Sequence, residues 1–178
     1  MKILIVYGTT EGQTRKIARY MQNALQESGH QVTISDAADE PPGVVGFDAV
    51  LIGGSLHMHK YQSALQHYIK DQVVRLNQLP GAFFSVCLAV ASGLPREQRE
   101  AEKIMEDFLQ DTGWRPLMTT QVAGALRYTE YDFFKRLLMK LIARREGHPT
   151  ETSQDYEYTD WEAVRKFATE FARKAAVK

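Results

Sequence analysis

The stretch ILIVYGTTEGQT, residues 3–14, contains the strongest signal for the fold. Its apolar part, residues 3–6, is an unbroken run of leucine and β-branched residues that stops at Gly8, and such short nonalternating runs are typical of strands covered on both faces. After the turn, Ile17 begins a repeat at every third or fourth position that continues to Ser28 and predicts an amphipathic helix ending near Gly29. A buried strand followed by a helix is the repeating unit of a parallel sheet.

The same alternation of strand and helix continues along the chain. Further strands are expected at residues 32–34, 49–52, 82–88 and 117–123, and further helices at 63–76, from 95 through 109 and from 159 through 172. Capping boxes at Ser63 with Gln66 and at Thr159 with Glu162 mark two helix starts. With right-handed crossovers, this pattern predicts an α/β fold with a doubly wound five-stranded parallel sheet of order 2-1-3-4-5.

Length and composition limit the possible classes of protein. The chain of 178 residues is the size of one domain, and its 22 Lys and Arg balance 22 Asp and Glu, which argues against a nucleic-acid-binding surface. The single cysteine, Cys87, excludes an intrachain disulfide framework and is expected to be a small apolar filler. No apolar run suits a signal peptide or a membrane span, so we expect a cytoplasmic protein whose only membrane contact is peripheral.

The turn after the first strand, from Gly8 to Thr14, is a candidate phosphate site. A helix start offers N–H donors and the positive end of a dipole, Thr9 and Thr10 add hydroxyls, and Gly12 lets the backbone close around an anion. The turn matches neither the Gly-x-Gly-x-x-Gly fingerprint nor a Walker A loop. The alternative is that these threonines only cap the helix.

Three further loops, residues 53–61, 88–95 and 124–128, are expected to be irregular and to meet this turn at the carboxyl edge of the sheet. The first of them mixes apolar side chains with two imidazoles, as a wall beside a flat heteroaromatic ring would. The alternative is a surface loop with two incidental histidines. His57 and His59 lack the further ligands of a metal site, so none is expected.

The residues of the turn resemble the FMN-phosphate loop of flavodoxins, which usually reads Thr/Ser-x-Thr-Gly-x-Thr. Over nearly its whole length the chain also resembles the flavodoxin-like, menaquinone-dependent protoporphyrinogen IX dehydrogenases of bacteria. The stretches that carry this resemblance are EGQTR at 11–15, IG with Ser55 at 52–55, Tyr61 with SA at 63–64, RLN at 75–77, WRP at 114–116, AGALRY at 123–128 and YTDWE at 158–162. The strings at 123–128 and 158–162 are the most specific.

The resemblance implies a long-chain flavodoxin fold that binds FMN noncovalently. By position, the phosphate would lie against Thr9, Thr10, Glu11, Gly12, Gln13 and Thr14. One face of the isoalloxazine would lie against Ser55, Leu56, His57, Met58 and Tyr61, and the other against Leu88, Ala89, Val90, Ala91, Ser92 and Gly93.

A long insertion, about residues 124–158, interrupts the pattern before the last helix, far beyond the usual loop length. Its segment 131–146 predicts an amphipathic helix, and residues 127–145 contain six basic residues against two acidic ones, a local net charge of +4. Such a helix suits a membrane interface, where a quinone is dissolved. Packing on the protein's own body or on a second subunit is the alternative, and the acidic stretch 151–162 would favour it.

The leading functional hypothesis is an FMN-dependent oxidoreductase that oxidises protoporphyrinogen IX with a quinone acceptor in haem biosynthesis. Arg127 would pair with a substrate propionate or a quinone oxygen, and Tyr128 would stack on a ring or donate a hydrogen bond. A flavodoxin-type electron carrier and a soluble NAD(P)H-quinone reductase are the alternatives, and a homo-oligomer stays open.

Overall fold

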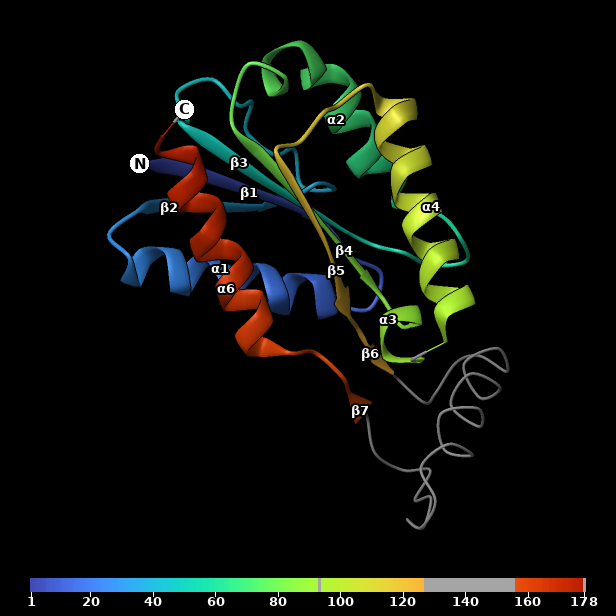
Figure 1. Cartoon of the computed structure of the whole chain (residues 1–178). Helices are drawn as coiled ribbons and strands as arrows, with labels where there is room; N and C mark the ends of the chain where they lie inside the picture. Colours follow the sequence, from blue (N-terminus) through green and yellow to red (C-terminus); the bar gives the residue numbers. More distant parts are fainter. Residues whose placement is uncertain (93, 127–155, 178) are drawn as a thin grey trace.

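The computed structural model describes residues 1–92, 94–126 and 156–177, and its centre is a parallel sheet of five strands (Figure 1). The strands are β1 (Lys2–Gly8), β2 (Gln31–Asp36), β3 (Ala49–Ser55), β4 (Gly81–Cys87) and β5 (Met118–Ala123). They lie in the order β2-β1-β3-β4-β5. This confirms the sheet order predicted from the alternation of strands and helices.

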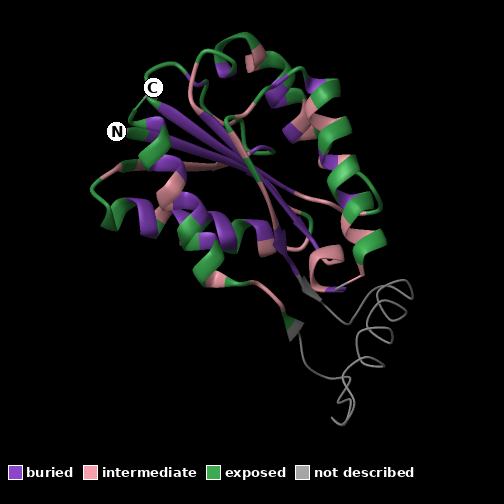
Figure 2. Ribbon diagram, in the orientation of Figure 1, coloured by how far each residue is buried: buried purple, intermediate pink, exposed green. Residues whose placement is uncertain are grey.

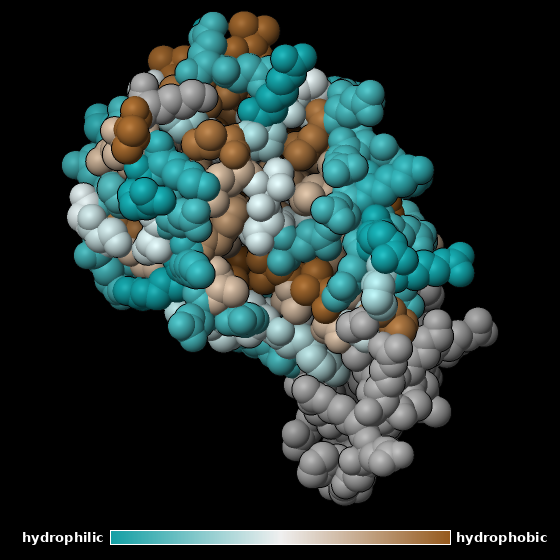
Figure 3. All heavy atoms as spheres, in the orientation of Figure 1, coloured by the Kyte–Doolittle hydropathy of each residue, from teal (hydrophilic) through white to brown (hydrophobic). Residues whose placement is uncertain are grey.

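Helices cover both faces of the sheet. On one face lie α1 (Gln13–Glu27) and α6 (Trp161–Ala175), and on the other lie α2 (Ser63–Leu76) and α4 (Pro95–Thr112). The strands β1, β3 and β4 are buried along nearly their whole length, as Figure 2 shows. Figure 3 shows hydrophilic residues over the outer faces of the helices and hydrophobic residues in the strip between the two helix layers.

The unbroken apolar run of β1 is explained by the two layers of helices, one on each face of the sheet. Ile3 and Ile5 pack in the core cluster beneath α1 and α6, whereas Leu4 and Val6 pack in the cluster beneath α2 and α4, and all four are fully buried. Successive side chains of a strand point to opposite faces, so a strand covered on both sides has no polar positions. β1 pairs with β2 on one side and with β3 on the other, so it is an interior strand of the sheet.

Both predicted capping residues are wrong by one position. The residue before α2 is Gln62, whose side chain makes no capping bond, and Ser63 is already the first helical residue. The N-cap of α6 is Asp160, which accepts a hydrogen bond from the Ala163 amide at 3.0 Å. Thr159 does not cap, because its hydroxyl donates to the carbonyl of Ala123 in β5.

The segment 88–95 was expected to be an irregular loop, and this prediction is wrong in part. It contains a one-turn helix, α3 (Ala89–Ser92), which Ser92 stabilises by donating its hydroxyl to the Ala89 carbonyl at 2.7 Å. The strand before it ends at Cys87 rather than at Leu88, because the chain turns directly into this helix. α3 therefore lies at the carboxyl edge of the sheet (Figure 1).

The two ends of the predicted insertion lie side by side. β6 (Ala125–Leu126) and β7 (Tyr156–Glu157) form a two-stranded antiparallel sheet, and the Tyr158 amide donates to the Gly124 carbonyl. The helix predicted at 131–146, together with Arg127 and Tyr128, lies outside the described residues.

Candidate functional site at the carboxyl edge of the sheet

The turn between β1 and α1 is the first part of the site. Gly12 precedes α1 with a φ of 89°, a left-handed conformation that favours glycine, and a side chain there would meet no neighbour. The position therefore requires glycine for its backbone rather than for space. The Gly12 amide donates to the Thr9 hydroxyl at 2.9 Å, so one of the donors expected to face a phosphate is bonded within the turn.

Thr14, in the first turn of α1, has a buried hydroxyl group that could bind a ligand. Its side chain is 0% exposed, and among the described residues nothing bonds its hydroxyl oxygen. Leaving such a group without a partner costs about 1–3 kcal/mol. The first turn of α1 contains no acidic residue, so the positive end of the helix dipole is not neutralised there. An orphaned hydroxyl beside helical amides is the chemistry that a phosphate monoester satisfies.

The end of β3 contacts this turn through a residue that the sequence did not single out, Gln62. Its side-chain amide donates to the Ser55 hydroxyl at 2.6 Å, to the Ser55 carbonyl at 3.1 Å and to the Thr10 hydroxyl at 3.0 Å. Gln62 thus joins the turn of residues 8–14 to the loop of residues 55–61. A polar residue directly after Tyr61 was its only sequence signal.

That loop ends in a tight two-residue turn. His57 and Lys60 exchange two backbone hydrogen bonds of 3.0 Å, and between them Met58 and His59 have φ values of 47° and 63°. Two successive left-handed residues favour Asn-Gly, so this turn is strained. Met58 is 78% exposed, and Nε2 of His59 lies 3.2 Å from the carboxyl group of Glu100 in α4. The turn therefore presents an apolar side chain beside the edge of the sheet.

Tyr61 anchors the loop of residues 55–61 to the body of the protein. Its ring lies 5.5 Å from Phe83 and 4.5 Å from Phe108, and its hydroxyl is 2.7 Å from that of Ser85 in β4. Gly54 leaves the space for this ring, because a Cβ there would lie 2.7 Å from it. Burial raises the pKa of the Tyr61 phenol far above its ordinary value, so the group stays protonated. Tyr61 packs in the core, and the exposed part of the loop is the strained turn.

A chain of hydrogen bonds connects the start of α1 to β5 and to the segment before α6. Gln13 donates to the Thr159 hydroxyl at 2.9 Å, and that hydroxyl donates to the Ala123 carbonyl at 2.8 Å. Lys16, one turn further along α1, forms an ion pair with Glu157 of β7. The side chain of Gln13 is therefore engaged in holding the turn in place. Of this residue, only the backbone N–H is left to face an anion.

The buried thiol at this edge is not activated. Burial raises the pKa of Cys87, so the group stays a thiol at neutral pH, as the prediction of an apolar filler requires. Within residues 1–92, 94–126 and 156–177 no three His, Cys, Asp or Glu side chains form a group that could hold a metal ion. None of the helices in this part of the chain combines the length and apolar character needed to span a bilayer.

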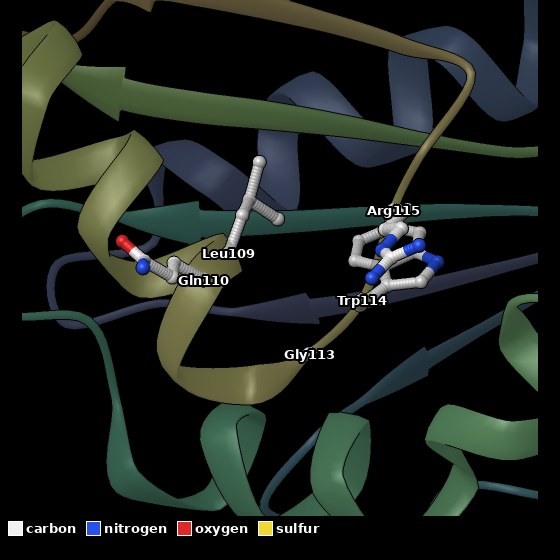
Figure 4. Close-up of a pocket in the computed structure, with 5 residues that line it drawn as sticks. All are labelled: Leu109, Gln110, Gly113, Trp114 and Arg115. Atoms are coloured by element: carbon white, nitrogen blue, oxygen red, sulfur yellow. The ribbon is translucent and has the colours of Figure 1, made fainter.

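A hollow of about 240 Å³ lies at the C-terminal end of α4 (Figure 4). It is lined by Leu109, Gln110, Gly113, Trp114 and Arg115. The ring of Trp114, 1% exposed, lies close to Gly81, where β4 begins. This hollow is therefore at the edge where the parallel strands start, apart from the candidate site.

Comparison with known proteins identifies the family. A model described as a flavodoxin domain matches residues 4–153. The chain is 39% identical over 173 residues to the protoporphyrinogen IX dehydrogenase [quinone] of Escherichia coli strain K12, covering 97% of this chain and 95% of that one. The chain belongs to this flavodoxin-like family. The protoporphyrinogen IX dehydrogenase [quinone] of Leishmania major is 34% identical over 173 residues, 96% of this chain and 74% of that one.

Solved flavodoxins share the fold. Oxidised flavodoxin 1 from Bacillus cereus superimposes with a TM-score of 0.60 at 17% identity, covering 97% of this chain and 98% of that one. A flavodoxin from the domain Archaea gives a TM-score of 0.57 at 16% identity, with 99% of each chain covered. These likenesses confirm the flavodoxin-like fold that the sequence predicted.

Most of the predicted site residues lie at one edge of the sheet. The turn from Thr9 to Thr14, the loop from Ser55 to Tyr61, and Leu88 with α3 all follow the carboxyl ends of parallel strands. Gly93, Arg127 and Tyr128 fall outside the described residues. The role of each residue toward a cofactor or substrate stays a prediction.

Proposed function

We propose that this chain, as a single domain, is an FMN-dependent protoporphyrinogen IX dehydrogenase that delivers electrons to a quinone, menaquinone in bacteria, in haem biosynthesis. The observation that carries the proposal is the match along nearly the whole chain to the Escherichia coli enzyme, whose name states both substrate and acceptor. The orphaned hydroxyl of Thr14 supports the cofactor independently, since it fits a phosphate at the start of α1.

The phosphate would be bound by hydroxyls and backbone amides rather than by cations. Thr14 and Thr10 supply hydroxyls, and the first turn of α1 supplies N–H groups. The nearest basic side chains are engaged elsewhere, because Arg15 lies 3.9 Å from Asp36 and Lys16 is bonded to Glu157. The strained turn at Met58 on one side and α3 on the other would flank the ring system.

The reaction removes six electrons and six protons from protoporphyrinogen IX, and bound FMN would supply a two-electron acceptor for each step. The described residues contribute binding and orientation. The Tyr61 and Cys87 groups stay protonated and lie within the protein, so neither serves as a base at neutral pH. We propose that Arg127 binds a propionate of the substrate or an oxygen of the quinone, and that Tyr128 stacks on a ring.

We also propose where the protein acts. The acceptor is lipid-soluble, and the sequence of 131–146 predicts a basic amphipathic helix, so a cytoplasmic protein would reach the quinone by peripheral contact with the membrane. Replacing Phe134, Leu138 and Ile142 by Ser would lower association with anionic vesicles and leave stability unchanged if this helix docks there. A loss of several kcal/mol in stability would instead indicate a core helix.

The proposal is tested with the purified protein. We expect a flavin absorbance spectrum and a rise of protoporphyrin fluorescence when protoporphyrinogen IX and menaquinone are supplied together, with no comparable rise when the quinone is omitted. Flavin binding without that rise would refute the substrate assignment. Quinone reduction driven by NADPH would then indicate a quinone reductase, and flavin reduction without activity on either substrate an electron carrier.

A further inference from the structure

We infer that Gln62 binds the ribityl chain of FMN, accepting a hydrogen bond from one of its hydroxyls through Oε1 while Nε2 remains bonded to Ser55. The inference rests on the proposed FMN-binding function and deepens it. It adds a cofactor-binding residue that neither the turn motif nor the likeness to flavodoxins assigns.

Gln62 contacts both segments that the ribityl chain would connect. Its side chain is bonded to Thr10 of the 8–14 turn and to Ser55 at the start of the 55–61 loop, and the ribityl chain joins the phosphate of FMN to its ring. Tyr61 fixes the chain directly before it, through its bond to Ser85. The Gln66 amide donates to the Gln62 carbonyl and closes the first turn of α2 directly after it.

The orientation of the side-chain amide follows from its partners. The Ser55 carbonyl lies 3.1 Å away and can only accept, so the atom that faces it must be the NH₂ group. Oε1 is therefore the other atom, and it is buried with no hydrogen-bond partner among the described residues. Oε1 of Gln62 lies over Gly8, and a Cβ atom at position 8 would be 2.7 Å from this oxygen. A side chain at position 8 would displace this amide from the end of β1.

An amide oxygen excluded from water requires a donor. The polar groups around Gln62, the Thr10 hydroxyl and both oxygens of Ser55, are used by Nε2. Gln62 also makes no capping bond to its own helix, although it is the residue before α2. A polyol chain crossing from the phosphate turn to the ring supplies hydroxyl donors at this place, and the phosphate and the ring's carbonyls do not.

The test separates a ribityl contact from a purely structural brace. Gln62→Leu keeps the size of the side chain and removes its polar atoms. The matched control is Gln66→Leu, one turn further along α2, where the side chain bonds Asp111 of α4 at 2.5 Å and lies away from the site. Each variant is titrated with FMN, riboflavin and lumiflavin, which lacks the ribityl chain, and flavin fluorescence gives the dissociation constants.

We expect Gln62→Leu to weaken FMN and riboflavin by roughly tenfold, the equivalent of one hydrogen bond, and to leave lumiflavin binding unchanged. Gln66→Leu should change none of the three. Equal weakening of all three flavins by Gln62→Leu, or no weakening at all, would overturn the inference and leave FMN binding intact. If the wild-type protein binds no FMN, the proposed function itself fails. Should Gln62→Leu not fold, Gln62→Asn, which withdraws the amide by one methylene, is expected to give the same pattern.

Discussion

Thr14→Val should change the stability of the FMN-free protein and its affinity for FMN in opposite directions. Valine has nearly the volume and the helix propensity of threonine, so the change removes little besides the hydroxyl. The Thr14 side chain is 0% exposed, and its hydroxyl has no partner among the described residues. Removing it relieves part of a desolvation cost of about 1–3 kcal/mol, so we expect the free energy of unfolding to rise by about 1 kcal/mol.

The same change should weaken FMN binding. A hydrogen bond from a hydroxyl to a phosphate oxygen is charge-assisted and contributes about 1.5–3 kcal/mol, so the dissociation constant should rise by roughly ten- to a hundredfold. Riboflavin has no phosphate, and its affinity should not change. Urea unfolding of the FMN-free protein and fluorescence titration with the two flavins measure both effects.

The matched control is Thr112→Val at the far end of α4. Thr112 is 4% exposed, but its hydroxyl donates to the Leu109 carbonyl at 3.1 Å, so its loss should destabilise the protein by about 1 kcal/mol and leave FMN affinity unchanged. If Thr14→Val destabilises the FMN-free protein as this control does, the Thr14 hydroxyl is not orphaned. If it weakens FMN and riboflavin equally, the hydroxyl does not contact the phosphate. Either result would refute the reasoning.

Two substitutions and one labelling experiment test the packing and capping of the sheet and helices that hold the site. Gly53→Ala should destabilise the protein by about 3 kcal/mol, since its Cβ would lie 2.0 Å from the ring of Phe84, and a melting curve that matches wild type would contradict this packing. Asp160→Ala should lower the free energy of unfolding by about 1 kcal/mol through loss of the cap on the Ala163 amide, as urea titration would show; no change would mean that the cap contributes nothing. Cys87 should react slowly with iodoacetamide at pH 8 and rapidly after unfolding, because burial raises its pKa, and rapid labelling of the native protein would exclude a buried thiol.

The two glycines near the end of β3 show what a local sequence pattern can predict and what it cannot. The sequence predicts a strand that ends at residue 52 and a loop from residue 53, yet Gly53 and Gly54 both lie within β3. Their role is to leave space for Phe84 of β4 and for Tyr61, and these contacts join segments far apart in sequence. A local pattern predicts where a chain changes direction, but not which distant ring fills the space above a glycine.

The two capping boxes failed for a related reason. Ser63 and Thr159 each carry the right hydroxyl three residues before the right partner. Thr159 is instead bonded to Ala123 in β5, a competing acceptor that exists only once α6 has packed on the sheet. Asp160, one residue later, is then free to cap the helix. Tertiary hydrogen bonds thus decide which of two adjacent polar residues caps the start of this helix.

The order of the sheet, its two-sided burial and the glycine turn before α1 were determined by the sequence itself, because periodicity and glycine placement are local properties of the chain. Tertiary structure alone decided that Tyr61 packs against Ser85 and Phe108, that Gln62 bridges Thr10 and Ser55, and that the hydroxyl of Thr14 has no partner among the described residues. Each of these depends on distances between atoms brought together from separate strands and helices. Such distances are set by packing, and no spacing along the chain encodes them.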